Sequence, residues 1–250
     1  MIPPLKLDQH FLKDENVLGK IVDAAQISSN DIILEIGPGK GILTAELAKK
    51  AEKVVAIELD EEFKLFLDKM PANVEVKYGN ALEIIDKINF NKIVANIPYN
   101  ITEPLFGKLL RTRVEITVLL IGKNFYNILT GKDSKWSVII PVFFDVTKVV
   151  DVPRWFFEPM PRTDSVVILL KKRQAQLGLA EQIIKEFVLQ EDKKVFNALA
   201  EAFVRIEKLT QKQAKEKVSE LKLPDKLLDK KVAYLSNRQF LTISGKIRKL

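Results

Sequence analysis

The sequence predicts an α/β protein, in which a parallel sheet covered by helices on both faces is followed by a small all-helical domain. Two observations support this prediction. The first two thirds of the chain alternate between short β-rich runs and amphipathic stretches, which is typical of strand–helix–strand units. Beyond Leu170, apolar residues recur only at helical spacing. We place the boundary after Lys171, so the predicted domains are residues 1–171 and 172–250.

The predicted elements of the first domain follow in chain order. Seven runs are predicted as strands: Ile32–Ile36, Val54–Leu59, Val74–Tyr78, Lys92–Ala95, Ile116–Ile121, Val138–Phe144 and Ser165–Leu170. Three helical patterns lie between the earlier runs: Ile42–Ala51, Glu61–Met70 and Glu103–Leu110. We expect Thr102 to cap the last of these helices, with Pro104 in its first turn, where a missing N–H costs nothing.

The last third begins with a polar linker, KKRQAQLGL, and continues with helices. Ile183, Phe187 and Val188 recur at helical spacing, Pro224 interrupts the pattern, and Ser236–Gln239 has the spacing of a capping box. This region is therefore predicted to be a compact helical domain.

Composition excludes several function classes. The 250 residues contain no cysteine, which excludes disulfides, thiolate metal sites and a cysteine nucleophile. His10 is the only histidine, which excludes a multi-histidine metal site and argues against a Ser-His-Asp triad. No apolar run reaches the roughly 18 residues that span a bilayer, and the N-terminus lacks the apolar segment of a secretory signal. We therefore expect a cytoplasmic protein with no metal and no membrane partner.

The net charge of +7 is unevenly placed along the chain. Residues 1–171 carry 22 basic and 23 acidic side chains, whereas residues 172–250 carry 18 basic and 10 acidic ones. A basic module beside a neutral one indicates a polyanionic partner, most often a nucleic acid. From charge alone, a lysine-rich solvated helical surface explains the pattern equally well.

A glycine loop follows the first predicted strand. Gly37, Gly39 and Gly41 form G-x-G-x-G, which matches neither the dinucleotide fingerprint nor the phosphate loop. Glu58, which lies 21 residues after Gly37, ends the second strand and can accept both hydrogen bonds of a ribose diol. A ribose without pyrophosphate fits S-adenosylmethionine, and Glu35 can face its ammonium or sulfonium. The alternative is a plain strand-to-helix turn with convenient glycines.

A second motif follows the fourth strand. The side-chain oxygen of Asn96 and the carbonyl of Ile97 can accept both N–H groups of an adenine N6 amine, which frees its lone pair for methylation. Pro98 stiffens the turn, and Tyr99 can stack on the base. An activated sulfonium donor needs no strong base, so positioning accounts for the remaining chemistry. The alternative is a turn without a catalytic role.

A third segment, Trp155–Pro161, places aromatic residues on a proline-rich loop. One of these rings can close the opposite face of a flipped base. For Trp155 and Phe156, however, we favour the alternative that they plug the hydrophobic core beneath the linker.

Together these motifs resemble the rRNA adenine N6-dimethyltransferases, the KsgA family, to which the Erm enzymes are related. Six segments spread over most of the chain are similar to motifs of this family: Gln9–Leu12, Ile33–Thr44, Ala56–Asp60, Gly79–Leu82, Asn96–Thr102 and Phe157–Ser165.

The resemblance implies a Rossmann-like S-adenosylmethionine-dependent methyltransferase domain and a small helical domain. It implies dimethylation of two adjacent adenines in a hairpin loop near the 3′ end of small-subunit rRNA, by a monomer that acts on the rRNA or the pre-small subunit. It assigns catalysis to Asn96, Pro98 and Tyr99, and base stacking to Phe157. Cofactor binding, with S-adenosylhomocysteine as the product, is assigned to Gln9, His10, Leu12, Glu35, Gly37, Gly39, Glu58, Asn80, Ala81 and Asn96. For His10, a structural role is the favoured interpretation.

The chain departs from the family pattern at four positions. Asn80 replaces the usual Asp, Gly122 and Asn124 stand in a segment where the family has Gln-Lys-Glu, and Asp8 stands where Gly often precedes the Gln. The departures at Asn80, Gly122 and Asn124 suggest a competing hypothesis, a ribosome-assembly factor that has lost catalysis. The intact glycine loop and the Asn96–Tyr99 turn argue against this hypothesis. An Erm-type enzyme acting on large-subunit rRNA is a second competing hypothesis, and a methyltransferase for glutamine side chains or DNA bases is a third.

Overall fold

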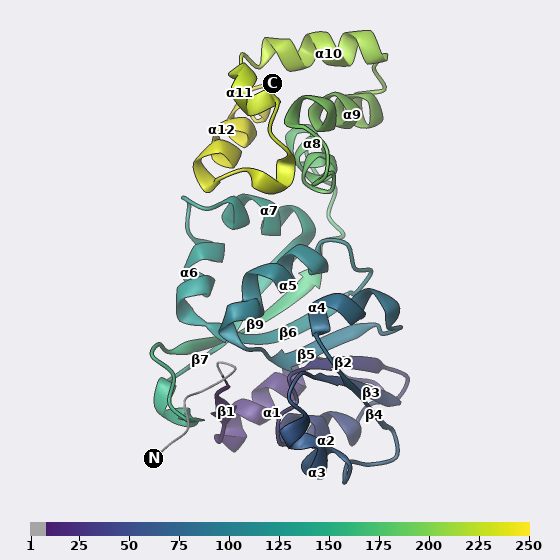
Figure 1. Cartoon of the computed structure of the whole chain (residues 1–250), viewed down its shortest axis with the longest axis vertical. Helices are drawn as coiled ribbons and strands as arrows, with labels where there is room; N and C mark the ends of the chain where they lie inside the picture. Colours follow the sequence, from purple (N-terminus) through teal and green to yellow (C-terminus); the bar gives the residue numbers. More distant parts are fainter. Residues whose placement is uncertain (1–8) are drawn as a thin grey trace. The chain divides into compact units, whose positions relative to one another are not determined.

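A computed structural model of the chain describes residues 9–250, which form two compact units. The first unit comprises the residues up to Tyr126 together with Val146–Lys172, and the second comprises Asn127–Asp145 together with Arg173–Leu250. Figure 1 traces the chain through both units.

The first unit is built on a seven-stranded sheet. Its order is β4 (Val74–Tyr78), β3 (Lys53–Glu58), β2 (Ile32–Ile36), β5 (Lys92–Asn96), β6 (Ile116–Gly122), β9 (Ser165–Lys172) and β7 (Phe144–Val152). The five strands from β4 to β6 are parallel, and β9 pairs antiparallel with β6. Two short strands, β1 (Phe11–Leu12) and β8 (Phe157–Glu158), form a separate antiparallel pair. The predicted mostly parallel sheet is confirmed.

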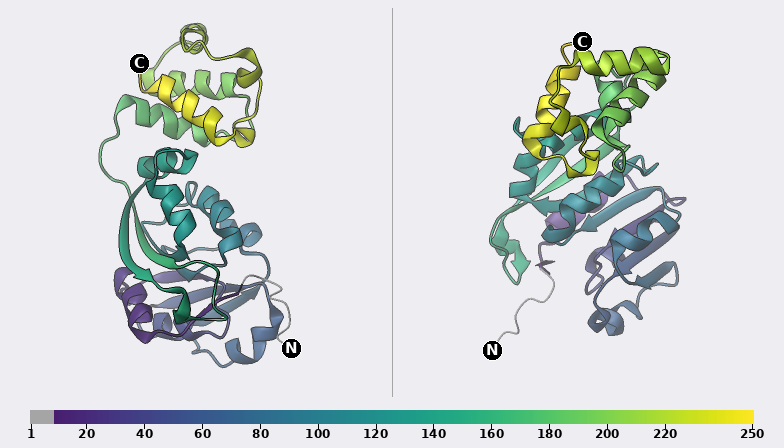
Figure 2. Two further views of the ribbon diagram at one scale, coloured as in Figure 1. Left: turned by 90° about the vertical axis from the view of Figure 1, so that its left-hand side faces the viewer. Right: turned by 45° about the horizontal axis from the view of Figure 1, so that its top comes forward.

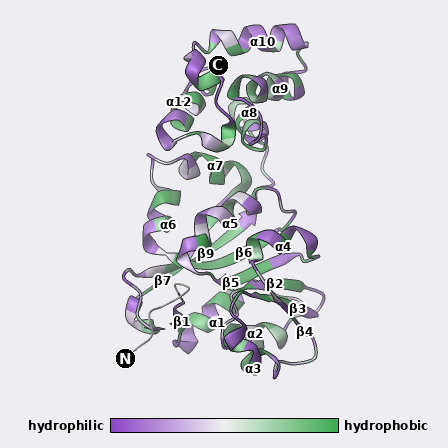
Figure 3. Ribbon diagram, in the orientation of Figure 1, coloured by the Kyte–Doolittle hydropathy of each residue, from purple (hydrophilic) through white to green (hydrophobic). Residues whose placement is uncertain are grey.

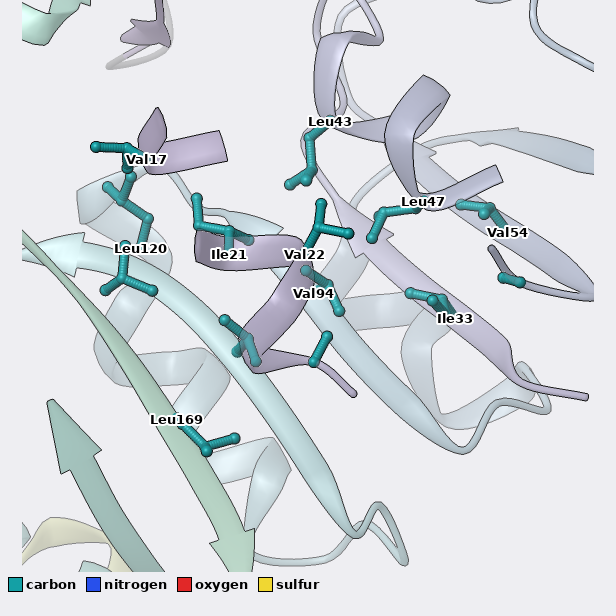
Figure 4. Close-up of a cluster of buried hydrophobic side chains, with 14 of the residues drawn as sticks. Val17, Ile21, Val22, Ile33, Leu43, Leu47, Val54, Val94, Leu120 and Leu169 are labelled. Atoms are coloured by element: carbon teal, nitrogen blue, oxygen red, sulfur yellow. The ribbon is translucent and has the colours of Figure 1, made fainter. Parts of the chain in front are cut away.

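Helices cover both faces of this sheet. They are α1 (Glu15–Ala24), α2 (Ile42–Ala48), α3 (Lys64–Leu67), α4 (Ala81–Ile84) and α5 (Thr102–Leu109), with the 3₁₀ turns η1 (Glu61–Phe63), η2 (Ile85–Lys87), η3 (Tyr99–Ile101) and η4 (Arg154–Phe156). Helix α6 (Lys123–Thr130) follows β6 and continues into the second unit. Apolar residues of α1 and α2 pack on one face against Ile33, Val94 and Leu120 (Figure 4). The alternate strand residues Leu34 and Ile93 are buried too, because the opposite face is also covered (Figure 2).

The second unit is helical. It contains α7 (Lys135–Phe143), α8 (Leu179–Val188), α9 (Val195–Glu207), α10 (Gln211–Glu220), α11 (Asp225–Leu228), η5 (Val232–Tyr234) and α12 (Asn237–Ile247). Phe187, Phe203 and Phe240 are buried in its core, whereas α10 is mostly hydrophilic (Figure 3). Ser236 caps α12 through the predicted capping box with Gln239.

The prediction of a strand over Val138–Phe144 was wrong. Most of this run lies in α7, which Ser134 caps by accepting a hydrogen bond from the backbone N–H of Trp136. The periodicity of a short apolar run does not distinguish a buried helix from a buried strand. In the structure, α7 packs against α8 and α12. Residues 127–145 consequently belong to the second unit, although they lie within the predicted 1–171 domain.

Several smaller elements were missed or misplaced. Helices α1 and α6 and strands β1, β7 and β8 were not predicted. The predicted cap on α5 was wrong, because η3 precedes this helix and Thr102 is its first residue, with a hydroxyl that is buried and has no hydrogen-bond partner among the described residues. Pro104 does lie in the first turn of α5, as predicted.

A buried cluster around Asp31 joins the starts of β2 and β5. Its carboxylate accepts hydrogen bonds from the Ser28 N–H at 2.6 Å and the Asn91 amide at 2.6 Å, and it pairs with the Lys92 ammonium at 2.7 Å. Burial alone would raise the pKa of Asp31, but the hydrogen bonds from Lys92, Ser28 and Asn91 outweigh it and lower the pKa to about 2. The cluster fixes the two strands at the sheet edge opposite their carboxyl ends.

Over residues 9–250, the structure has no helix with both the length and the apolar character needed to span a membrane.

Substituting Asp31→Asn should destabilise the protein by about 2–4 kcal/mol at pH 7, because it removes a charged acceptor and leaves Lys92 buried without its partner. The pKa of Asp31 is lowered in the folded state. The ionised carboxylate therefore stabilises the folded protein fully above about pH 4, and this stabilisation is lost as the pH falls through about 2. Urea unfolding at pH 7 and near pH 2 measures both effects. The matched control is Asp23→Asn, which removes an exposed ion pair with Lys50 and should change stability by less than about 1 kcal/mol. An Asp31→Asn deficit of the same size at both pH values would contradict the assignment.

Candidate functional site

A cavity in the first unit lies at the carboxyl ends of the parallel strands. The glycine loop after β2, the end of β3, the start of α4 and the turn after β5 all line it, as does the segment that contains β1. Every predicted site residue except Phe157 is among the residues that line this cavity. The motifs are scattered in sequence but meet here because parallel strands end at one edge of the sheet.

The glycine loop needs its glycines for two reasons. Gly37, Gly39 and Gly41 have φ angles of 70°, 55° and 79°, in the region that other residues rarely adopt. A Cβ atom at Gly39 would lie 2.7 Å from Cε1 of Phe11, and one at Gly37 would lie 3.5 Å from Cδ of Pro98. The loop therefore contacts both the N-terminal segment and the turn after β5.

Glu58 holds the glycine loop in place. Its carboxylate is buried, and it accepts hydrogen bonds from the backbone N–H groups of Gly39 and Asp60, both at 2.9 Å. Each carboxylate oxygen has a second lone pair, so Glu58 can accept further hydrogen bonds from a ligand in the cavity.

Glu35 lines the cavity and is only 2% exposed. Its Oε2 atom is buried without a hydrogen-bond partner among the described residues. Burial, helped by the nearby Glu58 charge and opposed by the Thr44 hydroxyl, raises the pKa of Glu35 to about 8. An unpaired buried carboxyl group that lines a cavity suits a cationic ligand.

Asn80 caps α4. Its side-chain oxygen accepts from the Leu82 N–H at 3.0 Å, and its amide donates to Glu83 at 2.9 Å. Ala81 follows it, buried in the cavity wall. Asp and Asn are both good N-caps, so the departure from the family pattern at this position preserves the local structure.

The turn after β5 presents an oriented amide and a fixed aromatic ring. The Asn96 amide donates to the carbonyl of His10 at 3.0 Å, so its oxygen remains available as an acceptor. The Tyr99 hydroxyl lies 2.5 Å from the hydroxyl of Ser165, which is fully buried. A Cβ atom at Gly122 would lie 3.5 Å from the Tyr99 ring, so the Gly122 backbone supports that ring.

The N-terminal segment closes the side of the cavity. Nδ1 of His10 is 2.8 Å from the Pro159 carbonyl, and the His10 ring lies 5.7 Å from the Tyr99 ring. Gln9 donates to Asp60 at 3.2 Å, and Leu12 also lines the cavity. These contacts place His10 against the turn, and its favoured structural role stays a prediction.

Among the cavity residues that were not predicted, Phe11, Phe63 and Lys40 form a contact cluster. Phe11 packs against Phe63 with ring centroids 5.6 Å apart, and the Lys40 ammonium lies 5.5 Å from the centroid of the Phe11 ring. Phe11 and Lys40 both lie within quoted motifs, but motif matching does not reveal which side chains meet.

The prediction that Phe157 stacks on a target base is not met in this arrangement. Phe157 is 3% exposed, packs in the hydrophobic core with Val17 and Ile21, and does not line the cavity. The prediction of a hydrophobic plug holds for Phe156, which packs against the same core, but it was wrong for Trp155, which is 65% exposed.

Of the other family departures, one lies away from the cavity. Asn124 is exposed on α6 and does not line it, and Asp8 lies outside the described residues. Among residues 9–250, no group of three or more His, Asp or Glu side chains is arranged to hold a metal ion.

The fold and the cavity define the class of protein. A mostly parallel seven-stranded sheet, with a glycine loop after β2 and a polar turn after β5, is the architecture of a Rossmann-like methyltransferase. The chain belongs to the ribosomal RNA adenine dimethylase family, whose sequence profile matches residues 5–247.

Individual relatives agree with this assignment. A probable ribosomal RNA small subunit methyltransferase A of Methanococcus maripaludis is 40% identical over 194 residues, which cover 74% of this chain and 73% of that protein. The crystal structure of a dimethyladenosine transferase from Plasmodium falciparum covers 96% of this chain and 98% of its own, with a TM-score of 0.65 and 28% identity. The 23S rRNA methyltransferase ErmE shares the fold, with a TM-score of 0.61 and 23% identity over 95% of this chain and 99% of its own.

The raised pKa of Glu35 predicts a pH-dependent stability. Because the folded-state pKa of about 8 exceeds the usual 4.5, the folded protein should lose stability as the pH rises between these values. Glu35→Gln removes this titration. As the pH rises from 5 to 9, the free energy of unfolding of the variant should therefore increase relative to that of wild type by about 3–5 kcal/mol, as measured by urea unfolding. The control Glu46→Gln alters an exposed partner of Lys49 and should stay within about 0.5 kcal/mol of wild type throughout. A Glu35→Gln difference that does not vary with pH would mean that Glu35 is already ionised at neutral pH.

Proposed function

We propose that this protein dimethylates N6 of two adjacent adenines in a hairpin loop near the 3′ end of small-subunit rRNA, using S-adenosylmethionine, and that it acts during ribosome biogenesis. One observation carries the proposal: the glycine loop and the Asn96–Tyr99 turn line the same cavity. A nucleoside cofactor and a target base bound there would lie next to each other.

The cavity residues suit S-adenosylmethionine. The Gly39 backbone lies where a side chain would strike Phe11, and Glu58 keeps acceptor capacity for a ribose diol. Oε2 of Glu35 has no hydrogen-bond partner among the described residues, and a positively charged ligand beside it would favour ionisation of this carboxyl group. The bound cofactor would supply a methyl group activated on a positively charged sulfur.

The turn supplies the chemistry at the target amine. The Asn96 oxygen and the Ile97 carbonyl accept the two N6–H bonds, which withdraws the nitrogen lone pair from the adenine ring. The anchored Asn96 amide keeps this acceptor in place, and Tyr99 holds the base face. The lone pair forms the new N–C bond as the S–C bond breaks, and the N6 proton leaves to solvent. Catalysis is then mainly a matter of positioning.

The second unit suits binding to rRNA. Residues 172–250 carry the excess of basic side chains, and α10 exposes a mostly hydrophilic surface. Contacts with phosphates would supply affinity that falls steeply with salt. We further propose that the enzyme works as a monomer in the cytoplasm, on the rRNA or the pre-small subunit.

Asn96→Ala should lower methyl transfer at least about 100-fold while S-adenosylmethionine affinity stays within a few-fold, because the acceptor of the target amine is lost. Labelled methyl transfer measures the first effect and calorimetric titration the second. The control Asn30→Ala removes an exposed amide that does not line the cavity and should retain most of the activity. If Asn96→Ala loses methyl transfer and cofactor binding together, Asn96 acts as a structural turn residue and the assignment fails.

Mass spectrometry of rRNA tests the proposed function directly. Unmodified small subunits incubated with the protein and S-adenosylmethionine should yield dimethyladenosine at two adjacent positions. Product from large subunits alone would instead favour the Erm-type hypothesis. Absence of product from well-folded protein on several substrate preparations would refute the proposal. Titration with S-adenosylmethionine then tests the assembly-factor hypothesis, which predicts no binding at millimolar ligand.

A further inference from the structure

The segment between β7 and β9 exposes a large aromatic residue beside the cavity wall. Trp155 lies in η4 and is 65% exposed, and Met160 further along the segment is 56% exposed. Its neighbours Phe156 and Phe157 pack into the core, so the turn is anchored while the indole of Trp155 points outward. An anchored but exposed tryptophan presents a large flat surface that a partner can cover.

The charge around Trp155 favours an anionic partner. Arg154 and Arg162 are exposed, and neither forms an ion pair within the described part of the chain. The acidic residues of the segment are already engaged: Glu158 pairs with Lys13 at 2.8 Å, and Asp164 accepts from the Arg154 N–H at 3.1 Å. Trp155 and the two arginines are thus exposed on one segment of the chain. Exposed aromatic rings and guanidinium groups together suit unpaired nucleotides, which stack on the ring and contact the cations through phosphates.

Hydrogen bonds connect this segment to the turn that is proposed to hold the target. Strand β8 pairs with β1, whose two residues line the cavity, and the Lys13 N–H donates to the Phe156 carbonyl at 2.8 Å. His10 contacts the Pro159 carbonyl, and its own carbonyl accepts from the Asn96 amide. Trp155 therefore belongs to the rigid wall that carries Asn96, although it lies outside the cavity itself.

We propose that Trp155 is a stacking platform for an unpaired RNA nucleotide next to the target adenine, with Arg154 and Arg162 contacting the adjoining phosphates. This inference rests on the proposed function, because it requires an RNA substrate. Stacking outside the cavity holds the neighbouring nucleotide while the target base is turned inward.

The two tryptophans of the chain allow a direct test. Trp155 is exposed, whereas Trp136 is 6% exposed in the second unit. Titration with a stem–loop RNA that has two adjacent adenines in its loop should quench the Trp155 emission. The full-length Trp155→Phe variant retains only Trp136 and should show little quenching.

Kinetics supply the second measurement. Trp155→Ala should raise KM for unmodified small subunits about tenfold, with kcat and S-adenosylmethionine affinity nearly unchanged. Trp155→Phe keeps an aromatic ring, so its KM should be close to that of wild type. Arg154→Gln combined with Arg162→Gln should lessen the dependence of RNA affinity on salt. The control Leu65→Ala removes another exposed apolar side chain, 75% exposed and outside the cavity wall, and should leave KM unchanged.

The outcomes separate this inference from the proposed function. If wild type methylates rRNA but Trp155→Ala has the same KM and RNA does not quench Trp155, the stacking role is wrong. Sedimentation that shows self-association of wild type, lost in Trp155→Ala and insensitive to RNA, would make this surface a protein interface and would also overturn the inference. If wild type neither methylates nor binds RNA, the proposed function itself has failed.

Discussion

The pairing of β2 with β5 is the constraint on which the site depends. The chain passes from β2 outward through β3 to β4, and then returns to place β5 on the other side of β2. The strand order reverses at this point, so the loops that leave β2 and β5 diverge and leave space between them. The glycine loop and the Asn96 turn are these two loops. At the opposite ends of the same strands, the Asp31 cluster with Asn91 and Lys92 fixes their pairing. A slip in the pairing at that end would separate Gly37 from Pro98 at the other.

Two buried carboxyl groups at this point have opposite environments. Glu58 receives two backbone N–H groups, and those hydrogen bonds shape the glycine loop, so its burial is compensated within the protein. Glu35, one strand away, has an oxygen without a partner among the described residues and a raised pKa. Burying a polar group without a partner costs stability, and such a cost is typical of a position that serves a ligand. The protein thus uses one carboxylate to build the cavity and leaves the other for what enters it.

Sequence patterns predicted best the strands of which both faces are buried. Strands β2, β3, β5 and β6 are short, mostly apolar runs that are buried on both faces, and their bounds were predicted to within about a residue. Strand β4 lies at the sheet edge and is only partly buried, but its bounds were predicted equally well. The run over Val138–Phe144 is equally apolar, but Ser134 and the neighbouring helices make it a helix, and that information is not local. Strands β1 and β8 contain two residues each and exist only because they pair with each other, so no periodicity could indicate them. Most of the site was predictable because its motifs follow strand ends, whereas contacts such as Phe11 with Gly39 depend on the three-dimensional path of the chain.

The burial of Phe157 and the exposure of Trp155 also depend on the three-dimensional path of the chain, which the motifs do not reveal. Motif position suggested that Phe157 faces the substrate and that Trp155 fills the core, whereas the structure buries Phe157 and leaves Trp155 65% exposed. The antiparallel register, which pairs Leu12 with Phe157 and Phe11 with Glu158, sets the direction of each side chain in β8. Leu12 and Phe157 belong to the same apolar cluster, so Phe157 must point into the core and Glu158 outward to Lys13. With Phe156 and Phe157 both held by the core, the preceding turn has no apolar surface left for Trp155. Its exposure is therefore a consequence of the pairing that builds the cavity wall, and any surface that Trp155 forms is fixed relative to Asn96 by the same hydrogen bonds.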